Sequence, residues 1–239
     1  MKIKINNLKI KIFSDGANFK EMISSSKKKY IKGLTTNPSL MRKSGITDYQ
    51  KFAKSILKFV KKKPISFEVF SDNFLEMEKQ AKIINSWGKN VYVKIPITNS
   101  KGKSSFNLIK KLSDEGIKLN ITAITTFEQM IKLKKHLNKK VPCVISIFAG
   151  RIADTGRDPS NYVKKGVKMF KTHKKAEILW ASTREVYNIV QANNIGCHII
   201  TVPPDLIKKI SLFNKNLKSY SLETVKDFYN DAEKSKYKI

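Results

Sequence analysis

Val91-Tyr92-Val93-Lys94-Ile95-Pro96-Ile97 alternates with a period of two. Its four β-branched residues share one face, and Tyr92, Lys94 and Pro96 share the other. Residues of this type at this period are typical of a β-strand. The stretch therefore predicts a strand that carries one lysine among apolar neighbours.

The position of Lys94 admits two interpretations. An ammonium group inside a strand is costly unless it is paired or loses its proton. A neutral lysine amine attacks carbonyl carbon and forms a Schiff base. In the alternative interpretation, the strand lies at an edge and the lysine reaches water. Taken alone, the strand favours the alternative, because the chain contains 44 lysines.

Seven further segments also have the character of strands, and a helical pattern follows each of the eight. The predicted strands are 9–14, 30–35, 65–70, 91–97, 117–124, 141–148, 177–182 and 198–202. Helices expected between and after them include 102–115, 184–192 and 203–213. This alternation over 239 residues predicts an α/β fold, a (β/α)8 TIM barrel.

We expect residues 1–239 to form one barrel domain, with a C-terminal helical extension over about 216–239. Its helix is expected at 222–234, where it covers the barrel mouth or touches another subunit.

The net charge of +29 suggests a nucleic-acid binder as one alternative. However, only four of the 48 basic residues are arginine, and the lysines are spread along the whole chain. This distribution favours compositional drift toward lysine over a nucleic-acid-binding surface, so we expect no nucleic-acid partner. A positive surface would still attract anionic substrates.

Other sequence features indicate where in the cell the protein is expected and whether a metal site is expected. No apolar run is long enough for a membrane span, and no signal peptide is recognisable, so we expect a cytoplasmic protein without a membrane partner. Cys143 and Cys197 lie in apolar runs, as buried reduced thiols do. The three histidines are scattered, and we expect no metal site.

Polar residues recur near the carboxyl ends of the predicted strands, where barrel enzymes carry their active sites. They are Asp15, Asn37, Glu68, Lys94, Asn120, Thr122, Ser146, Arg151, Ser182 and Arg184.

Strand parity places several of these residues on one face of the sheet. Glu68 lies opposite an apolar set, Asn120 and Thr122 oppose Leu119, Ile121 and Ala123, and Ser146 again opposes an apolar set. The apolar residues can pack on the helices while the polar ones point into the barrel. This convergence raises the active-site interpretation of Lys94 above the alternative.

The residue types suggest roles in this site. Lys94 would form an imine with a ketone, while Asp15 and Glu68 move protons through a water molecule. Hydroxyl groups of a substrate would be held by Asn37, Asn120, Thr122 and Ser146. Arg151, Ser182 and Arg184 suit a phosphate group. Arg157 and Asp154 are interpreted as a loop salt bridge outside the site.

At these positions the chain resembles the transaldolase family, which includes the fructose-6-phosphate aldolases. The resemblance runs from about Ile10 to Phe213 and rests on a set of short segments. They are Phe13-Ser14-Asp15-Gly16-Ala17-Asn18, Gly33-Leu34-Thr35-Thr36-Asn37-Pro38-Ser39, Ser66-Phe67-Glu68-Val69, Val91-Tyr92-Val93-Lys94-Ile95-Pro96, Leu119-Asn120-Ile121-Thr122-Ala123, Ser146-Ile147-Phe148-Ala149-Gly150-Arg151-Ile152-Ala153-Asp154 and Ala181-Ser182-Thr183-Arg184.

The resemblance implies a class I aldol mechanism with Lys94 as the Schiff-base lysine and with no metal or organic cofactor. It also implies proton transfer by Asp15 and Glu68, with Thr122 in the catalytic group. Asn37 and Asn120 would lie near the imine and the substrate hydroxyl groups, and phosphate would bind at Arg151, Ser182 and Arg184. Phe148 is also expected among the substrate-binding residues. The implied partners are sugar phosphates, and we expect a homo-oligomer.

Two outcomes compete within the family. A transaldolase passes a dihydroxyacetone unit from a ketose phosphate, fructose 6-phosphate or sedoheptulose 7-phosphate, to an aldose phosphate, whereas an aldolase releases it. Members that transfer resemble this chain in having glutamate at Glu68 and phenylalanine at Phe148, so the resemblance favours transfer. The chain departs from the family pattern at Gly16, Ala153 and Thr183, which keeps a specialised sugar as an alternative.

Overall fold

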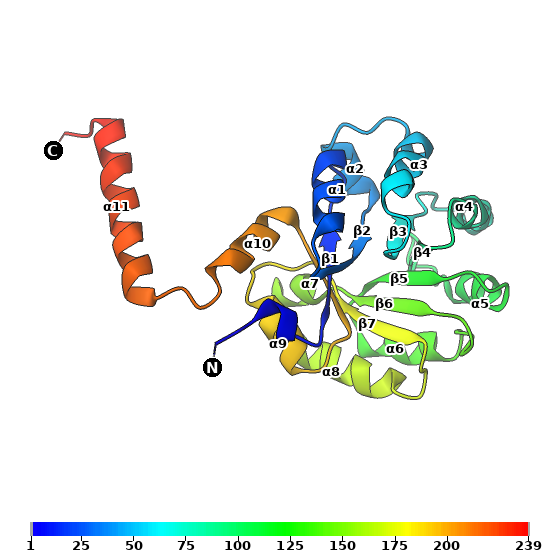
Figure 1. Ribbon diagram of the computed structural model, residues 1–239. Helices are drawn as coiled ribbons and strands as arrows, with labels where there is room; N and C mark the ends of the chain where they lie inside the picture. Colours follow the sequence, from blue (N-terminus) through cyan, green and yellow to red (C-terminus); the bar gives the residue numbers. More distant parts are fainter. Residues whose placement is uncertain (1, 239) are drawn as a thin grey trace.

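A computed structural model describes residues 2–238 as a closed barrel of eight parallel strands surrounded by helices (Figure 1). The strands follow one another in chain order around the barrel, and β1 pairs with β8 to close it. The predicted (β/α)8 TIM barrel is therefore confirmed.

The strands are β1 (Lys11–Asp15), β2 (Ile31–Thr35), β3 (Ile65–Glu68), β4 (Val91–Pro96), β5 (Leu119–Ile124), β6 (Cys143–Ile147), β7 (Ala176–Trp180) and β8 (Ile199–Val202). The helices are α1 (Phe19–Lys27), α2 (Pro38–Lys43), α3 (Tyr49–Phe59), α4 (Phe74–Ser86), α5 (Phe106–Asp114), α6 (Phe127–Lys134), α7 (Ala149–Ala153), α8 (Pro159–Phe170), α9 (Asn188–Asn194), α10 (Pro204–Lys208) and α11 (Leu217–Ser235), with 3-10 turns at Ile5–Asn7 and Lys209–Leu212.

The two faces of the barrel strands bury different side chains. Val91, Val93 and Ile95 of β4 are fully buried and belong to the core between the strands and the outer helices. Inside the barrel, a second apolar cluster made by Phe13, Val144, Leu179, Ala181 and Ile199 contacts Tyr92 and Phe148. Polar side chains lie nearer the carboxyl ends of the strands, so the interior changes from apolar to polar along its axis.

Several predicted segments differ from the observed elements. The predicted helix 203–213 is divided into α10 and the 3-10 turn Lys209–Leu212. Helix α5 begins at Phe106 rather than at residue 102, because Thr98 and Ser104 form an antiparallel bridge that keeps the preceding residues in a loop. Helix α9 begins at Asn188 rather than at 184, because the Asn188 side chain accepts hydrogen bonds from the main-chain N–H groups of residues 184 and 185.

A further difference lies in the C-terminal helix. Helix α11 begins at Leu217, five residues before the predicted start, because the Asn216 side chain accepts from Ser219 N and caps the first turn. Every residue of 216–238 is exposed, so α11 does not cover the mouth of its own barrel.

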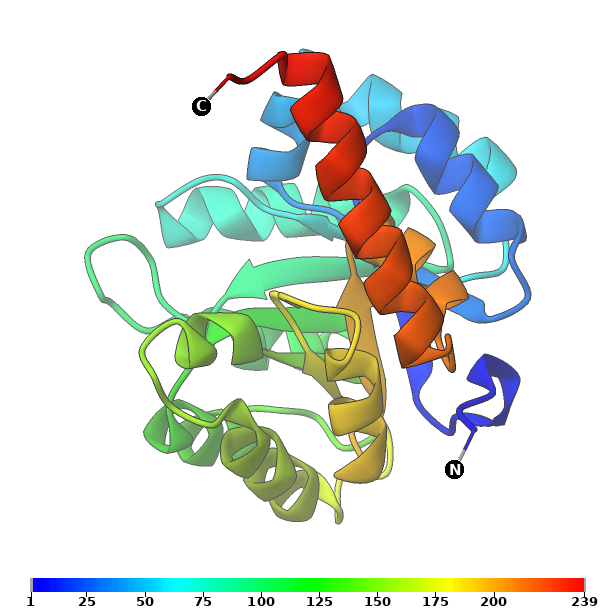
Figure 2. The same ribbon diagram turned by 90° about the vertical axis from the view of Figure 1, so that its left-hand side faces the viewer.

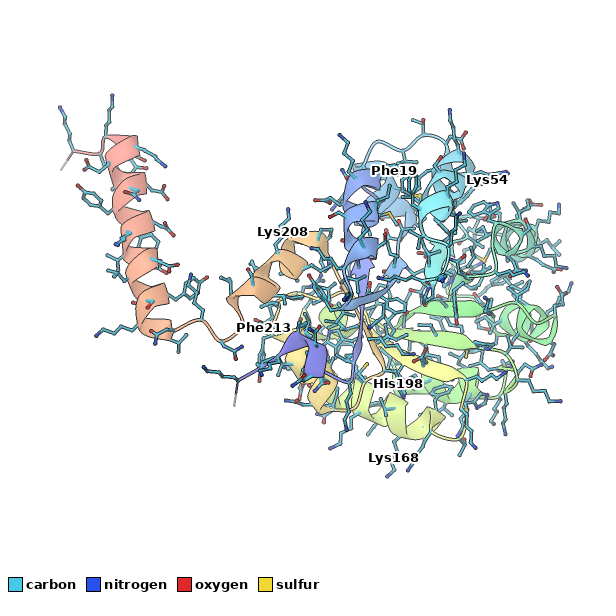
Figure 3. The ribbon with its side chains drawn as sticks, in the orientation of Figure 1. Phe19, Lys54, Lys168, His198, Lys208 and Phe213 are labelled. Atoms are coloured by element: carbon cyan, nitrogen blue, oxygen red, sulfur yellow. The ribbon has the colours of Figure 1, made fainter. Side chains whose placement is uncertain are left out.

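Helix α11 stands away from the barrel in Figure 1, and in Figure 2, which is seen from that side, the helix lies in front of the barrel. Phe213, labelled in Figure 3, is partly buried against the core and lies just before the linker to α11. Within residues 2–238, no helix combines the length and the apolar character needed to cross a membrane.

The packing of Phe13 over Gly33 gives a prediction about stability. A Cβ atom at Gly33 would lie 2.5 Å from Phe13 Cζ inside the barrel. We expect Gly33→Ala to lower the free energy of unfolding by about 1–3 kcal/mol, since overpacking forces side chains out of place. Urea denaturation measures the loss. The control Gly16→Ala adds a Cβ 3.6 Å from Pro204, which is ordinary contact. An equal effect of both substitutions would contradict the packing account.

Candidate active site

A cavity of about 660 Å³ opens at the carboxyl ends of the strands. All eleven predicted site residues line it: Asp15, Asn37, Glu68, Lys94, Asn120, Thr122, Ser146, Phe148, Arg151, Ser182 and Arg184. The structure thus brings the predicted residues to one place, while their chemical roles stay predictions.

Lys94 lies in the cavity wall with only 8% of its side chain exposed. Its Nζ is 3.1 Å from Glu68 Oε2 and 3.3 Å from the carbonyl oxygen of Thr36, to which it donates. The pair follows from strand register, because Glu68 on β3 lies directly beside Lys94 on β4. A buried ammonium group needs such a partner. The edge-strand interpretation of Lys94 is therefore wrong.

Tyr49 supports the end of β3. Its hydroxyl donates to the Glu68 carbonyl at 2.8 Å, and the same oxygen is the acceptor for the Glu68 N–H, also at 2.8 Å. The Tyr49 ring packs against Phe67, Phe70 and Trp87. The backbone that carries the Glu68 carboxylate is therefore held by an aromatic cluster, which sequence reasoning did not identify.

Asp15 lies at the end of β1 and lines the same cavity. Burial raises the pKa of its carboxyl group, whereas the Lys94 charge and the Thr35 hydroxyl group lower it and the nearby Glu68 raises it slightly. Burial is the largest of these effects, so the pKa lies above its usual range. A carboxyl group in this condition is suited to accept and return a proton.

A chain of hydrogen bonds fixes the amide group of Asn120. Its Nδ2 donates to Ser66 Oγ at 3.0 Å, and its Oδ1 accepts from Ser146 Oγ at 2.6 Å. Thr122, on the same strand, has a buried Oγ1 without a hydrogen-bond partner among the described residues. Because it lines the cavity, this hydroxyl group can serve a substrate oxygen or a water molecule.

The strand β5 departs from the predicted alternation after Thr122. Ala123 was expected to pack outward with Leu119 and Ile121, but it is exposed and lines the cavity. The register with β6 shifts between Ile121 and Ile124, and Ala123 has a φ of 62°. This irregularity turns the backbone, so the strict period-two assignment is wrong at this residue.

Asn37 reaches the cavity from the start of the short helix α2. Its Oδ1 accepts from Leu40 N at 2.9 Å and caps the helix, which leaves its amide nitrogen as a donor toward the cavity. Lys43, at the end of the same helix, also lines the cavity. Sequence reasoning missed Lys43, because α2 itself was not predicted.

The predicted phosphate-binding residues come together through a close backbone contact. A Cβ atom at Gly150 would lie 1.7 Å from the carbonyl oxygen of Ser182, so only glycine allows α7 to approach the loop after β7. This contact places Arg151 of α7 near Ser182 and Arg184. Ser182 has a φ of 64°, a left-handed conformation that costs energy in a non-glycine residue.

Arg184 already has an anionic partner in this structure. Its Nε donates to Asp154 Oδ1 at 3.0 Å, and its Nη2 contacts Asp154 Oδ2. Arg157 instead donates to Thr155 Oγ1 at 2.8 Å. The predicted Asp154–Arg157 salt bridge is therefore wrong, because the loop turns the Asp154 carboxylate toward Arg184. A phosphate bound at this site would either share the Arg184 guanidinium group with Asp154 or displace the Asp154 carboxylate from it.

The arrangement suits carbonyl chemistry at an amine. A lysine beside two carboxyl groups can attack a ketone carbon and exchange protons with the substrate, while amide and hydroxyl groups orient the substrate. Among residues 2–238, no group of three or more His, Cys, Asp or Glu side chains is placed to hold a metal ion.

Sequence comparisons relate this chain to known proteins. Residues 12–239 match a family described as "Transaldolase/Fructose-6-phosphate aldolase". A "Probable transaldolase" of Nitrosopumilus maritimus is 34% identical over 229 residues, which cover 95% of this chain and 96% of that protein. A "Probable transaldolase" of a Thermoanaerobacter species is 35% identical over 81% of this chain and 86% of its own length.

Solved structures with low sequence identity share the fold. The 3-hexulose-6-phosphate synthase of Salmonella typhimurium superposes with a TM-score of 0.55 at 11% identity, covering 81% of this chain and 89% of that one. At this identity the similarity shows the barrel architecture alone.

The raised pKa of Asp15 predicts how stability depends on pH. Between the ordinary value of 3.8 and the folded pKa, the folded chain holds a proton that the unfolded chain releases, so stability falls as the pH rises over this interval. We expect Asp15→Asn to remove this fall, so that its stability relative to the original chain increases from pH 3.8 up to the folded pKa of Asp15 and is constant above it. Each unit by which the pKa is raised corresponds to about 1.4 kcal/mol.

Urea unfolding at several pH values measures this difference. Asp231→Asn on the exposed helix α11 is the matched control for removing one carboxylate. A stability difference for Asp15→Asn that does not grow with pH would contradict the account.

Proposed function

Because this chain belongs to the transaldolase/fructose-6-phosphate aldolase family, we propose that it transfers a dihydroxyacetone unit from a ketose phosphate to an aldose phosphate through an imine on Lys94. The observation that carries this proposal is the buried contact of 3.1 Å between Lys94 Nζ and Glu68 Oε2 at the wall of the cavity.

The reaction would begin with proton transfer from the Lys94 ammonium group toward Glu68. The neutral amine then attacks C2 of the ketose, and the C2 oxygen takes up the proton that Glu68 received and leaves as water, which gives a protonated imine. Asp15 accepts the proton of the C4 hydroxyl group, the C3–C4 bond breaks, and its electron pair moves into the enamine. The first aldose phosphate is released, while three carbons stay on Lys94.

The second half of the reaction reverses these steps on another aldose phosphate. Carbon C3 of the enamine bonds to the aldehyde carbon, and the aldehyde oxygen takes the proton back from Asp15. Water then hydrolyses the imine and frees Lys94. Thr122 suits the positioning of this water, because its buried hydroxyl group has no partner among the described residues.

Substrate recognition divides between two parts of the cavity. Asn37, Asn120 and Ser146 would bind hydroxyl groups of the sugar. Arg151, Ser182 and Arg184 would bind its phosphate, with Phe148 forming an apolar wall. The lysine-rich surface would raise the local concentration of such anions.

An assay with fructose 6-phosphate tests this function. With erythrose 4-phosphate as acceptor, we expect sedoheptulose 7-phosphate, and Lys94→Met should reduce its formation by about 1,000-fold or more. Lys175→Met is the control, because that lysine precedes β7 at the opposite end of the barrel. Free dihydroxyacetone formed without an acceptor would instead favour the aldolase alternative. Absence of both products in folded protein would refute the proposal.

We further propose that the chain functions as a homo-oligomer joined by α11. The helix has an apolar stripe that includes Leu217, Val225 and Phe228, whose exposed fractions are 80%, 58% and 69%. Tyr220 and Tyr229 flank this stripe. Apolar side chains so exposed on a helix whose described residues are all exposed favour a protein partner.

The charge of α11 favours a second copy as that partner. The helix carries four acidic residues and three lysines, a net charge of −1, whereas the whole chain carries +29. Its acidic residues therefore complement the lysine-rich barrel of another copy. Without them, two copies of this basic chain would repel each other.

Sedimentation velocity tests this assembly. We expect an oligomer for the full chain and monomers for the double variant Val225→Glu/Phe228→Glu, which puts charge into the apolar stripe. Glu223→Gln/Lys226→Gln on the polar face of α11 is the control and should leave the oligomer intact. A monomeric full chain, or an unchanged oligomer in the double variant, would contradict the proposal.

A further inference from the structure

Two buried threonine hydroxyl groups lie beside Asp15 and have no part in the reaction as described above. Thr35 is the last residue of β2 and is the register partner of Asp15 on β1. Thr201 lies on β8, the strand that pairs with the other edge of β1. Thr35 is 2% exposed and Thr201 is 5% exposed, and both line the cavity.

The hydrogen bonds of these residues have one consistent direction when Asp15 is ionised. Thr35 Oγ1 donates to Asp15 Oδ1 at 2.7 Å, and the hydroxyl oxygens of Thr35 and Thr201 are themselves in hydrogen-bond contact. A hydroxyl group has a single proton. Because Thr35 uses its proton on Asp15, Thr201 must be the donor to Thr35.

We propose that Thr201 and Thr35 form a two-hydroxyl relay that orients the Asp15 carboxyl group and sets its affinity for a proton. The proposal rests on the proposed function, in which Asp15 exchanges a proton with the C4 hydroxyl group. Both threonines are positioning residues, since they act through Asp15.

The relay has a geometric consequence for Asp15. By occupying Oδ1, Thr35 leaves Oδ2 as the oxygen that can meet the substrate. The backbone anchors the relay at its far end, because the Thr201 carbonyl accepts from Thr183 Oγ1 at 2.7 Å. Thr183 lies between Ser182 and Arg184, so the relay joins Asp15 to the loop that would bind phosphate.

The relay also acts on the charge of Asp15. The charged groups that face Asp15 are Lys94 on β4 and Glu68 on β3. Burial opposes ionisation of the carboxyl group, while Lys94 and the Thr35 hydroxyl group favour it. Among the described residues that act on Asp15, Thr35 is the only uncharged hydrogen-bond donor. Thr201 strengthens the hydrogen bond from Thr35 to Asp15 by polarising the Thr35 hydroxyl group.

Valine and serine substitutions test this relay, since valine keeps the shape of threonine and removes its hydroxyl group. The measurement is a pH titration of the Asp15 carboxyl carbon by ¹³C NMR, with Asp15→Asn used to assign the signal. We expect Thr35→Val to move the midpoint to higher pH by at least about half a unit. Thr201→Val should move it less, in the same direction, and Thr35→Ser should restore it.

Ser113→Ala provides the matched control. It removes a buried hydroxyl group that accepts from Asn138 N at 2.9 Å on α5, outside the cavity. We expect this variant to lose stability without moving the Asp15 midpoint. An unmoved midpoint in Thr35→Val, with the chain folded, would overturn the relay.

Kinetics separate this proposal from the proposed function. If Asp15 is the base, the acidic limb of the pH profile of kcat/KM should move with the NMR midpoint in Thr35→Val. A shifted midpoint in a chain without transferase or aldolase activity would refute the proposed function while supporting the relay. An active enzyme with an unshifted midpoint and an unshifted profile would refute the relay alone.

Discussion

The contact between Lys94 and Glu68 is the interaction on which the candidate site depends. An ammonium group that is 8% exposed would be too costly without a carboxylate beside it. The β3–β4 register supplies that carboxylate directly, and Tyr49 holds its backbone. An apolar cluster that includes Phe13 and Leu179 fills part of the barrel interior, and both residues of the pair line the cavity.

The surrounding groups extend the same pattern of paired charge and directed hydrogen bonds. Asp15 accepts from Thr35, Asn120 is held between two serines, and Arg184 is held by Asp154. These contacts orient side chains before any substrate arrives, which reduces the reorganisation that a reaction requires. Lys94 thus differs from the other 43 lysines of the chain in its burial and in its partners rather than in its charge.

The sequence was sufficient to predict the barrel and the residues that line its cavity, because strand parity and the position of strand ends carry that information. Parity placed Glu68, Asn120 and Ser146 correctly, but it failed at Ala123, where the register with β6 shifts. The short helices α2 and α7 were missed because five or six residues show little periodicity. Their absence also concealed Lys43.

Contacts between distant segments were the least predictable features. The partner of Asp154 depends on how closely α7 approaches the loop after β7, which Gly150 permits. The Thr35–Thr201 contact exists only because β8 closes the barrel onto β1. The sequence around each of these residues does not indicate which distant residue it will contact. The predicted roles of all these residues depend in turn on whether Lys94 is the reactive amine.

Reductive trapping followed by peptide mapping tests that question most directly. Borohydride added together with fructose 6-phosphate should leave a three-carbon adduct on Lys94. None of the other 43 lysines should carry a comparable amount of adduct. An adduct distributed over exposed lysines, or none at all on folded protein, would contradict the central claim that this buried amine is the nucleophile.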